Sequence, residues 1–276
     1  MPRRYEILAA IVLAGLAATA FAAPAHRIVS LSPGLTELAY AAGAGRYLVG
    51  TTAYTDYPPA ATTLPQVGDA FHIDVERLVA LKPSLVLAWA SSDPPKLLAR
   101  LRSLGFKVAL FKPRKLGDIA RNLRRIGKLA GTSRVADRAA DAFERGLDKL
   151  RRRYADSEAV RVFYEISAHP LYTINGEQII SQGIKLCGGR NIFARLPTLA
   201  APVSMAAVIA RNPQAIITGD SGGAASALKA WQQWSQVAAV KNDALFSVPA
   251  DEIARATPRM LDGIRKICRD LDTVRQ

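Results

Sequence analysis

The sequence is poor in the residues and motifs that most enzymes use for nucleophilic or metal-dependent chemistry. It holds two cysteines and three histidines in 276 residues. The histidines, His26, His72 and His169, are too scattered to form a metal site of recognisable spacing. GxSxG, HExxH, phosphate-loop and GxGxxG motifs are all missing. We therefore expect a protein that is not an enzyme and that binds no metal or cofactor.

The sequence also lacks an apolar run long enough to cross a bilayer, which takes about 20 residues in a helix. The apolar stretch 7–18 follows Arg3 and Arg4 and precedes Ala20 and Ala22, small residues of the kind that a signal peptidase recognises. This pattern predicts a removable signal peptide over residues 1–22. The mature protein is then exported, and we expect it in the periplasm.

Acidic residues are outnumbered, with 23 Asp and Glu against 37 Lys and Arg, a net charge of +14. Removing Arg3, Arg4 and Glu6 with the signal peptide lowers the net charge to +13. In the cytosol such a charge would suggest a nucleic-acid partner. Because the protein is exported, we expect no nucleic-acid partner. A solvated basic surface facing an anionic envelope is the first interpretation, and recognition of an acidic ligand is the second.

The two cysteines, Cys187 and Cys268, form no CxxC pair. An even number of cysteines in an oxidising compartment favours a disulfide. The bond would close a loop of about 80 residues and stabilise the fold by roughly 4–5 kcal/mol. Cys268 lies on the apolar stripe of a predicted C-terminal helix, in which Thr257 is the N-cap and Pro258 occupies the first turn. The stripe consists of Leu261, Ile264, Ile267 and Leu271.

Short apolar runs alternate with helical patterns, which indicates an α/β protein. The predicted strands are 27–31, 48–51, 85–88, 107–111, 161–164, 215–218 and 245–248. Between the fourth and fifth strands, 133–154 has apolar residues at helical spacing and predicts a helix about 33 Å long. We expect two Rossmann-like lobes, 23–131 and 157–276, joined by one long rigid helix within 132–156.

The two halves contain a related unit, found at 73–87 and again 130 residues later at 203–217. Each copy has a capped short helix, a proline and a buried strand. Two related lobes leave a cleft between them, and clefts between domains favour ligand binding.

Ligands of parallel α/β sheets sit beyond the carboxyl ends of the strands. Tyr54, Trp89 and the segment 251–255 follow such strands, and aromatic faces with a few carboxylates suit a large planar ligand. Each also has a structural interpretation. Tyr54 could be a turn residue, and Trp89 could belong to the core. Trp231 and Trp234, in a segment expected to be a loop, could form a lid or a small separate core.

The chain resembles the cobalamin-binding periplasmic proteins of ABC importers, which belong to the helical-backbone class of substrate-binding proteins. The motifs that carry the resemblance are RIVSLSP at 27–33, TEL at 36–38, YTDYPP at 54–59, ERLVALKP at 76–83, CGGRNIF at 187–193 and TPR at 257–259. The resemblance implies two α/β lobes bridged by one helix, with the corrinoid between the lobes and little closure on binding. It also implies capture of cobalamin or a related corrinoid and its delivery, by a monomer, to a permease dimer.

The resemblance assigns roles to individual residues. Tyr54 and Trp89 match cleft aromatics, and Asp251, Glu252, Ile253, Ala254 and Arg255 match a ligand-contacting loop of the second lobe. Cys187 and Cys268 match a disulfide of the family. Glu76 matches the first of two glutamates that dock to arginines of the permease, but Ala206 stands where the second is expected.

Aromatic cover differs from the family pattern as well. Ala70, Ala200 and Glu252 stand where a cobalamin binder of this family has tryptophan. The residues expected to compensate are Phe71, Tyr164, Trp231 and Trp234.

Two alternatives remain at this point. The first is a haem or siderophore binder of the same class, and haem would need an axial donor such as Tyr54, Tyr57 or His169. The second is an exported protein that acts on acidic envelope components, whose binding would weaken steeply with salt.

Overall fold

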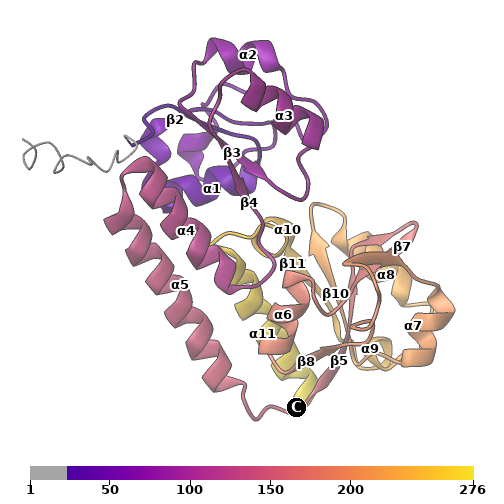
Figure 1. Cartoon of the computed structure of the whole chain (residues 1–276). Coiled ribbons are helices and arrows are strands. Elements are labelled where there is room, and N and C mark those ends of the chain that lie inside the picture. The colour runs from indigo at the N-terminus through magenta and orange to yellow at the C-terminus, as the bar shows by residue number, and fades with distance from the viewer. Residues whose placement is uncertain (1–23) are drawn as a thin grey trace, which may run out of the picture.

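The computed structural model describes residues 24–276, so the predicted signal peptide lies outside the described part of the chain. Two lobes lie one above the other in Figure 1, with a pair of long helices along one side. The first lobe contains β1 (Ile28–Ser30), α1 (Pro33–Ala41), β2 (Leu48–Gly50), α2 (Val75–Ala80), β3 (Leu85–Trp89), α3 (Pro95–Ser103) and β4 (Val108–Phe111). The two long helices, α4 (Gly117–Ala130) and α5 (Ser133–Arg153), follow.

The second lobe is built around a second parallel sheet. Its strands are β5 (Val160–Glu165), β6 (Ser167–Ala168), β7 (Leu171–Ile174), β8 (Gly189–Asn191), β9 (Ala200–Pro202), β10 (Ala215–Asp220) and β11 (Leu245–Pro249). Its helices are α6 (Ile179–Leu186), α7 (Met205–Arg211), α8 (Ala224–Trp231), α9 (Ala238–Lys241), α10 (Ala250–Ile253) and α11 (Met260–Arg275).

Each lobe has a four-stranded parallel sheet covered by helices on both faces. The strand order is β2-β1-β3-β4 in the first lobe and β11-β10-β5-β8 in the second. In the first sheet, Ile28 and Leu87 pack toward α1 and α4, whereas Val29 and Val86 pack toward α2 and α3. Alternate side chains along a strand face opposite sides of the sheet. Because helices cover both sides here, the strands are apolar on both faces.

All seven predicted strands are present, and the predicted helix 133–154 is α5. A third sheet, β6-β7-β9, is antiparallel and was not predicted. The strand β8 was not predicted either; it begins at Gly189, directly after the turn residue Gly188 with φ +74°.

The helix α5 packs along α4, and the two are held together by ion pairs as well as apolar contacts. The Arg124 guanidinium on α4 lies 2.6 Å from Asp141 and 2.8 Å from Glu144, both on α5. One apolar core continues from α1 through α4 and α5 to α6 and α11. The two lobes therefore share a core along this side of the molecule (Figure 1).

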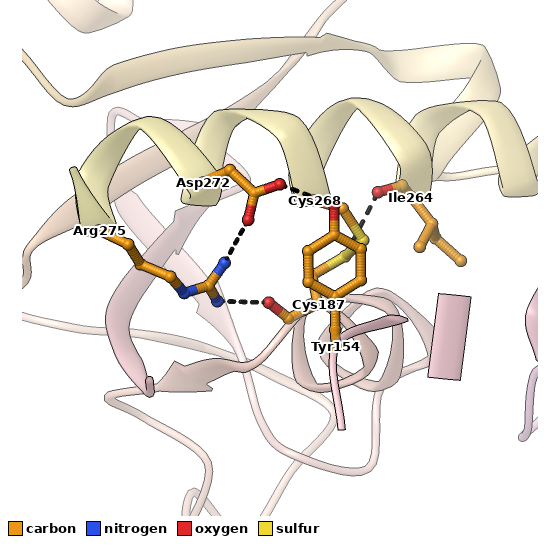
Figure 2. The surroundings of a disulfide bond; sticks show 6 residues. All are labelled: Tyr154, Cys187, Ile264, Cys268, Asp272 and Arg275. Atoms are coloured by element: carbon orange, nitrogen blue, oxygen red, sulfur yellow. Dashed lines mark hydrogen bonds and ion pairs between the residues drawn. A yellow bond between two sulfur atoms is a disulfide. The ribbon is translucent and has the colours of Figure 1, made fainter. Parts of the chain in front are cut away.

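The disulfide joins Cys187, just after α6, to Cys268 on α11 (Figure 2), as predicted. Around it, the Tyr154 hydroxyl at the end of α5 donates to Asp272 at 2.8 Å, and Arg275 donates to the Cys187 carbonyl oxygen at 2.6 Å. The ends of α5, α6 and α11 thus meet at one point.

The start of α11 differs from the sequence prediction. The helix begins at Met260 and Arg259 occupies the cap position, so Thr257 is not the N-cap. The Thr257 hydroxyl is instead used across the lobes, in a contact described below.

Candidate functional site

The first lobe places two aromatic side chains at the carboxyl edge of its sheet. Tyr54 follows β2 with a left-handed φ of 62° and is 81% exposed. Trp89 ends β3, half-buried, with its ring edge-on to Phe111 at 6.5 Å between centroids. Trp89 thus belongs partly to the core and presents the remainder of its ring at the sheet edge. Tyr54 presents nearly all of its side chain to solvent.

The second lobe contributes the segment 251–255, which was expected to be a loop. Asp251, Glu252 and Ile253 instead lie in the short helix α10, and Ala254 and Arg255 follow it. Ile253 is fully buried in the core, so neither its side chain nor its backbone is exposed to a ligand. Asp251, Glu252 and Arg255 are half-buried, and Ala254 is exposed.

Arg255 crosses from the second lobe to the first. Its guanidinium donates to Glu37 on α1 at 2.7 Å and to Asp56 at 2.6 Å, and lies 2.7 Å from Asp251 of its own helix turn. It also approaches the Tyr54 carbonyl oxygen at 3.4 Å. Arg255 therefore fixes the position of the turn that carries Tyr54.

Glu37 is the buried centre of this inter-lobe network, only 3% exposed. Besides Arg255 it accepts a hydrogen bond from the Thr257 hydroxyl at 3.0 Å, and the Arg259 guanidinium lies 3.5 Å away. Burial raises the pKa of Glu37 above its ordinary value, although the hydrogen bonds from Arg255 and Thr257 act in the opposite direction.

Asp251 and Asp56 both contact Arg255, and their pKa values are shifted in opposite directions. Partial burial, with the neighbouring Asp56 carboxyl, raises the pKa of Asp251. Burial also acts to raise the pKa of Asp56, but the hydrogen bond and charge of Arg255 outweigh it and the pKa is lowered. Arg255 and Asp56 therefore form a charged pair where the inter-lobe contact reaches the solvent.

The predicted site residues of the two lobes converge at Gly34, the second residue of α1. A Cβ at this position would lie 3.6 Å from the Trp89 ring and 3.8 Å from side-chain carbons of both Arg255 and Thr257. The structure therefore brings Trp89 of the first lobe and Arg255 of the second to the same point between the lobes.

A hollow of about 550 Å³ lies between the lobes, beside a second inter-lobe contact. Gln182 on α6 donates to the Arg114 carbonyl oxygen at 2.7 Å and accepts from the Leu116 amide at 3.3 Å. Arg114 and Lys115 line the hollow from the first lobe, and Glu177 and Lys185 line it from the second. Tyr54, Trp89 and Arg255 do not line it.

The residues expected to compensate for missing tryptophans behave differently from one another. Phe71 is 94% exposed and free to contact a ligand. Tyr164 and Trp231 are buried in the second lobe, so they cannot supply aromatic cover without unfolding part of the core. Trp231 ends α8 rather than lying in a loop, and its indole donates to Glu165 at 2.6 Å.

The two copies of the sequence repeat form matching helices. Asp74 caps α2 and Ser204 caps α7, each through a side-chain oxygen that accepts from the amide three residues on. Glu76 and Ala206 are therefore both second residues of their helices, and both are exposed. The structure confirms the correspondence of these two positions.

The sequence did not predict that Glu37, Asp56, Thr257 and Gln182 join the two lobes. Glu37 lies in the TEL motif that carries part of the family resemblance, but nothing local marks it as the partner of an arginine 218 residues away. No group of three or more potential metal ligands occurs among residues 24–276, and no helix in that range is long and apolar enough to span a membrane.

Two α/β lobes joined along one side, with aromatic and charged residues between them, define a two-lobed binding protein. The sequence profile of the periplasmic binding protein family matches residues 28–252, and the chain belongs to this family. The predicted α/β fold, the periplasmic location and the expected lack of catalytic activity are confirmed by this membership.

The chain is also similar to proteins that are named as vitamin B12-binding proteins. The vitamin B12-binding protein of Vibrio cholerae is 38% identical over 246 residues, covering 89% of this chain and 88% of the relative. The vitamin B12-binding protein of Yersinia pseudotuberculosis is 35% identical over 266 residues, covering 96% and 93%. The crystal structure of the periplasmic vitamin B12 binding protein BtuF of Vibrio cholerae superposes with a TM-score of 0.85 at 37% identity, covering 92% of this chain and 99% of that one.

Proposed function

We propose that the protein captures cobalamin or a related corrinoid between its lobes and delivers it to an ABC importer in the inner membrane. The observation that carries the proposal is the convergence of Trp89 and Arg255 between the lobes, in a chain that is 35–38% identical to vitamin B12-binding proteins over nine-tenths of its length. A corrin ring is broad and has amide side chains around its rim. Tyr54, Trp89 and Phe71 offer it apolar faces, and Asp251 and Arg255 offer its amides an acceptor and a donor.

Delivery would use the exposed tips of α2 and α7. Glu76 provides one carboxylate for an arginine of the permease. Ala206 provides none, so the second half of the contact depends on shape and apolar area. We propose that a single copy of the protein docks across the two permease subunits.

The test is titration of the purified protein with cyanocobalamin by calorimetry and by visible absorption. We expect saturable binding of one corrinoid per chain. Trp89→Ala and Tyr54→Ala should each weaken it about tenfold, because loss of one stacked aromatic face costs on the order of 1 kcal/mol or more. Tyr47→Ala is the matched control, since Tyr47 precedes β2 and lies at the opposite end of the same strand from Tyr54.

Three outcomes would contradict the proposal. No heat and no spectral change at tens of micromolar cyanocobalamin would exclude corrinoid binding. A Soret shift with haemin that depends on Tyr54, Tyr57 or His169, without a corrinoid response, would assign the protein to haem. Binding of acidic envelope polymers that vanishes with salt, in place of corrinoid binding, would favour a role at the envelope.

A further inference from the structure

A second hollow, of about 480 Å³, lies in the second lobe and is lined by four arginines. It is formed by β5, β8, the segment 192–196 and the C-terminal end of α7. Arg161 is the second residue of β5, so the hollow lies toward the amino end of the sheet, whereas the inter-lobe site lies at the carboxyl ends of the strands. The arginines are Arg161, Arg190, Arg195 and Arg211, and no acidic residue lines the hollow.

Two of these arginines are direct neighbours in the sheet. Arg161 on β5 is in register with Arg190 on β8. Neighbouring strands lie about 4.8 Å apart and paired residues project to the same side, so like charges at such a pair destabilise the sheet. In residues 24–276 none of the four arginines has a carboxylate within 4.0 Å. The pair therefore lacks a counter-charge from the protein.

Two of the arginines are held in place by other contacts. The Arg161 Nε donates to the Asn212 carbonyl oxygen at 3.1 Å. Arg211 donates to the Ala207 carbonyl oxygen at 3.0 Å, and its guanidinium lies 4.5 Å from the centre of the Phe193 ring. These contacts use part of each guanidinium and leave further N–H groups available to a ligand.

Several arginines elsewhere in the described part of the chain have carboxylate partners. Arg124 contacts Asp141 and Glu144, Arg255 contacts Glu37 and Asp56, and Arg275 contacts Asp272. The arginine-lined hollow thus combines concentrated positive charge, partial pre-ordering and a volume within the range of small-molecule sites, about 300–1,000 Å³.

We propose that the arginine-lined hollow binds an anion carrying two or more phosphate charges. Guanidinium groups match phosphate oxygens in bidentate geometry, and several of them are needed to neutralise more than one charge. The phosphates could belong to a soluble oligophosphate or to the headgroup of an anionic lipid, and both would present the same chemistry to Arg161, Arg190, Arg195 and Arg211. This site is independent of corrinoid binding.

The experiment compares two double variants that remove the same charge. Arg190→Ser with Arg195→Ser alters the hollow, and Arg138→Ser with Arg145→Ser removes two exposed arginines from α5 as the control. Each protein is titrated with sodium pyrophosphate by calorimetry at constant ionic strength. Each is also sedimented with phosphatidylcholine vesicles that contain cardiolipin, whose headgroup carries two phosphates, with pure phosphatidylcholine vesicles as the neutral reference. Circular dichroism melting checks that both variants fold.

We expect the hollow variant to weaken binding at least tenfold and the control variant to leave it unchanged within twofold. Pyrophosphate binding with this pattern supports the site and a soluble ligand, and vesicle binding alone with this pattern supports the site and a lipid headgroup. Equal losses in the two variants, or no binding to either probe by the wild-type protein, would overturn the proposal.

Discussion

The side chain of Arg255 joins the two lobes at the point where the ligand is proposed to bind. It satisfies Glu37, which is buried among groups from both lobes, and it also contacts Asp56 beside Tyr54. One residue therefore contributes to both the stability of the inter-lobe contact and the geometry of the site. Substitutions here should change stability and affinity together.

Arg255→Ala should lower the free energy of unfolding by about 3 kcal/mol, because it leaves the buried Glu37 carboxylate without its main partner. Urea unfolding measures the change. Adding Glu37→Gln to Arg255→Ala should recover part of the loss, since the unpaired charge is then removed. Arg265→Ala, which breaks an exposed pair with Asp262, is the control and should cost less than about 1 kcal/mol. Equal effects of Arg255→Ala and Arg265→Ala would contradict this view.

Glu165 is a second buried carboxyl, 1% exposed, at the end of β5. Burial raises its pKa above the ordinary value of 4.5, and the hydrogen bond from Trp231 opposes the rise. A raised folded-state pKa means that the folded protein binds this proton more tightly than the unfolded chain. The resulting stability is fully present below pH 4.5 and is lost as the pH rises through the raised value.

Glu165→Gln removes this dependence. The free energy of unfolding of the variant, relative to the wild-type protein, should therefore increase from pH 4.5 toward neutral pH. Glu144→Gln should show the opposite trend, and below pH 4.5, because the hydrogen bond from Arg124 lowers the pKa of Glu144. The stabilisation by Glu144 is fully present above its ordinary pKa of 4.5 and is lost as the pH falls through the lowered value. Unfolding curves at a series of pH values test both. Parallel pH profiles for the wild-type protein and Glu165→Gln would exclude this role of Glu165.

At the scale of elements, α2 and α7 are equivalent helices that differ at the residue proposed for docking. Glu76→Ala should reduce corrinoid uptake by reconstituted importer several-fold while leaving cyanocobalamin affinity unchanged, because Glu76 is exposed on α2 and absent from the contacts around Trp89 and Arg255. Ala206→Glu is the reciprocal change and should leave affinity unchanged too. Loss of affinity in Glu76→Ala would place Glu76 in the ligand site.

The elements that sequence predicted well are those whose signal is local. Seven of the eight strands of the two parallel sheets are short, mostly apolar runs, whereas the eighth, β8, reads Gly-Arg-Asn and was not predicted. The helix α5 has apolar residues such as Ala136, Phe143 and Leu147 at helical spacing. The strands of the third sheet, by contrast, have between two and four residues, and one of them, β9, reads Ala-Ala-Pro. Pairing with β7, and not side-chain preference, makes β6 and β9 extended.

The inter-lobe site was predicted only in part for the same reason. Tyr54 and Trp89 could be proposed because they follow predicted strands. The partners of Arg255 could not, because Glu37 and Asp56 are about 200 residues away and no periodic pattern links them. Thr257 was assigned to a helix cap because Thr-Pro is a common helix start, yet its hydroxyl contacts Glu37 across the lobes.

At the scale of the molecule, the second lobe is closed by α11, which the disulfide links to the segment after α6. Replacing both Cys187 and Cys268 by serine should lower the free energy of unfolding by roughly 4–5 kcal/mol, the upper figure for a loop of this length. Urea unfolding of the variant and of the wild-type protein with and without reductant measures it. A reduced wild-type protein as stable as the oxidised one would show that packing of α11 alone suffices.

The same disulfide has a consequence for the precursor before it crosses the membrane. Thiols stay reduced in the cytosol, so Cys187 and Cys268 can be joined only after export. Until then α11 is attached to its lobe by packing and hydrogen bonds, without a covalent link. The chain is therefore easier to unfold before and during export, and it reaches its full stability only in the periplasm, after the disulfide has formed.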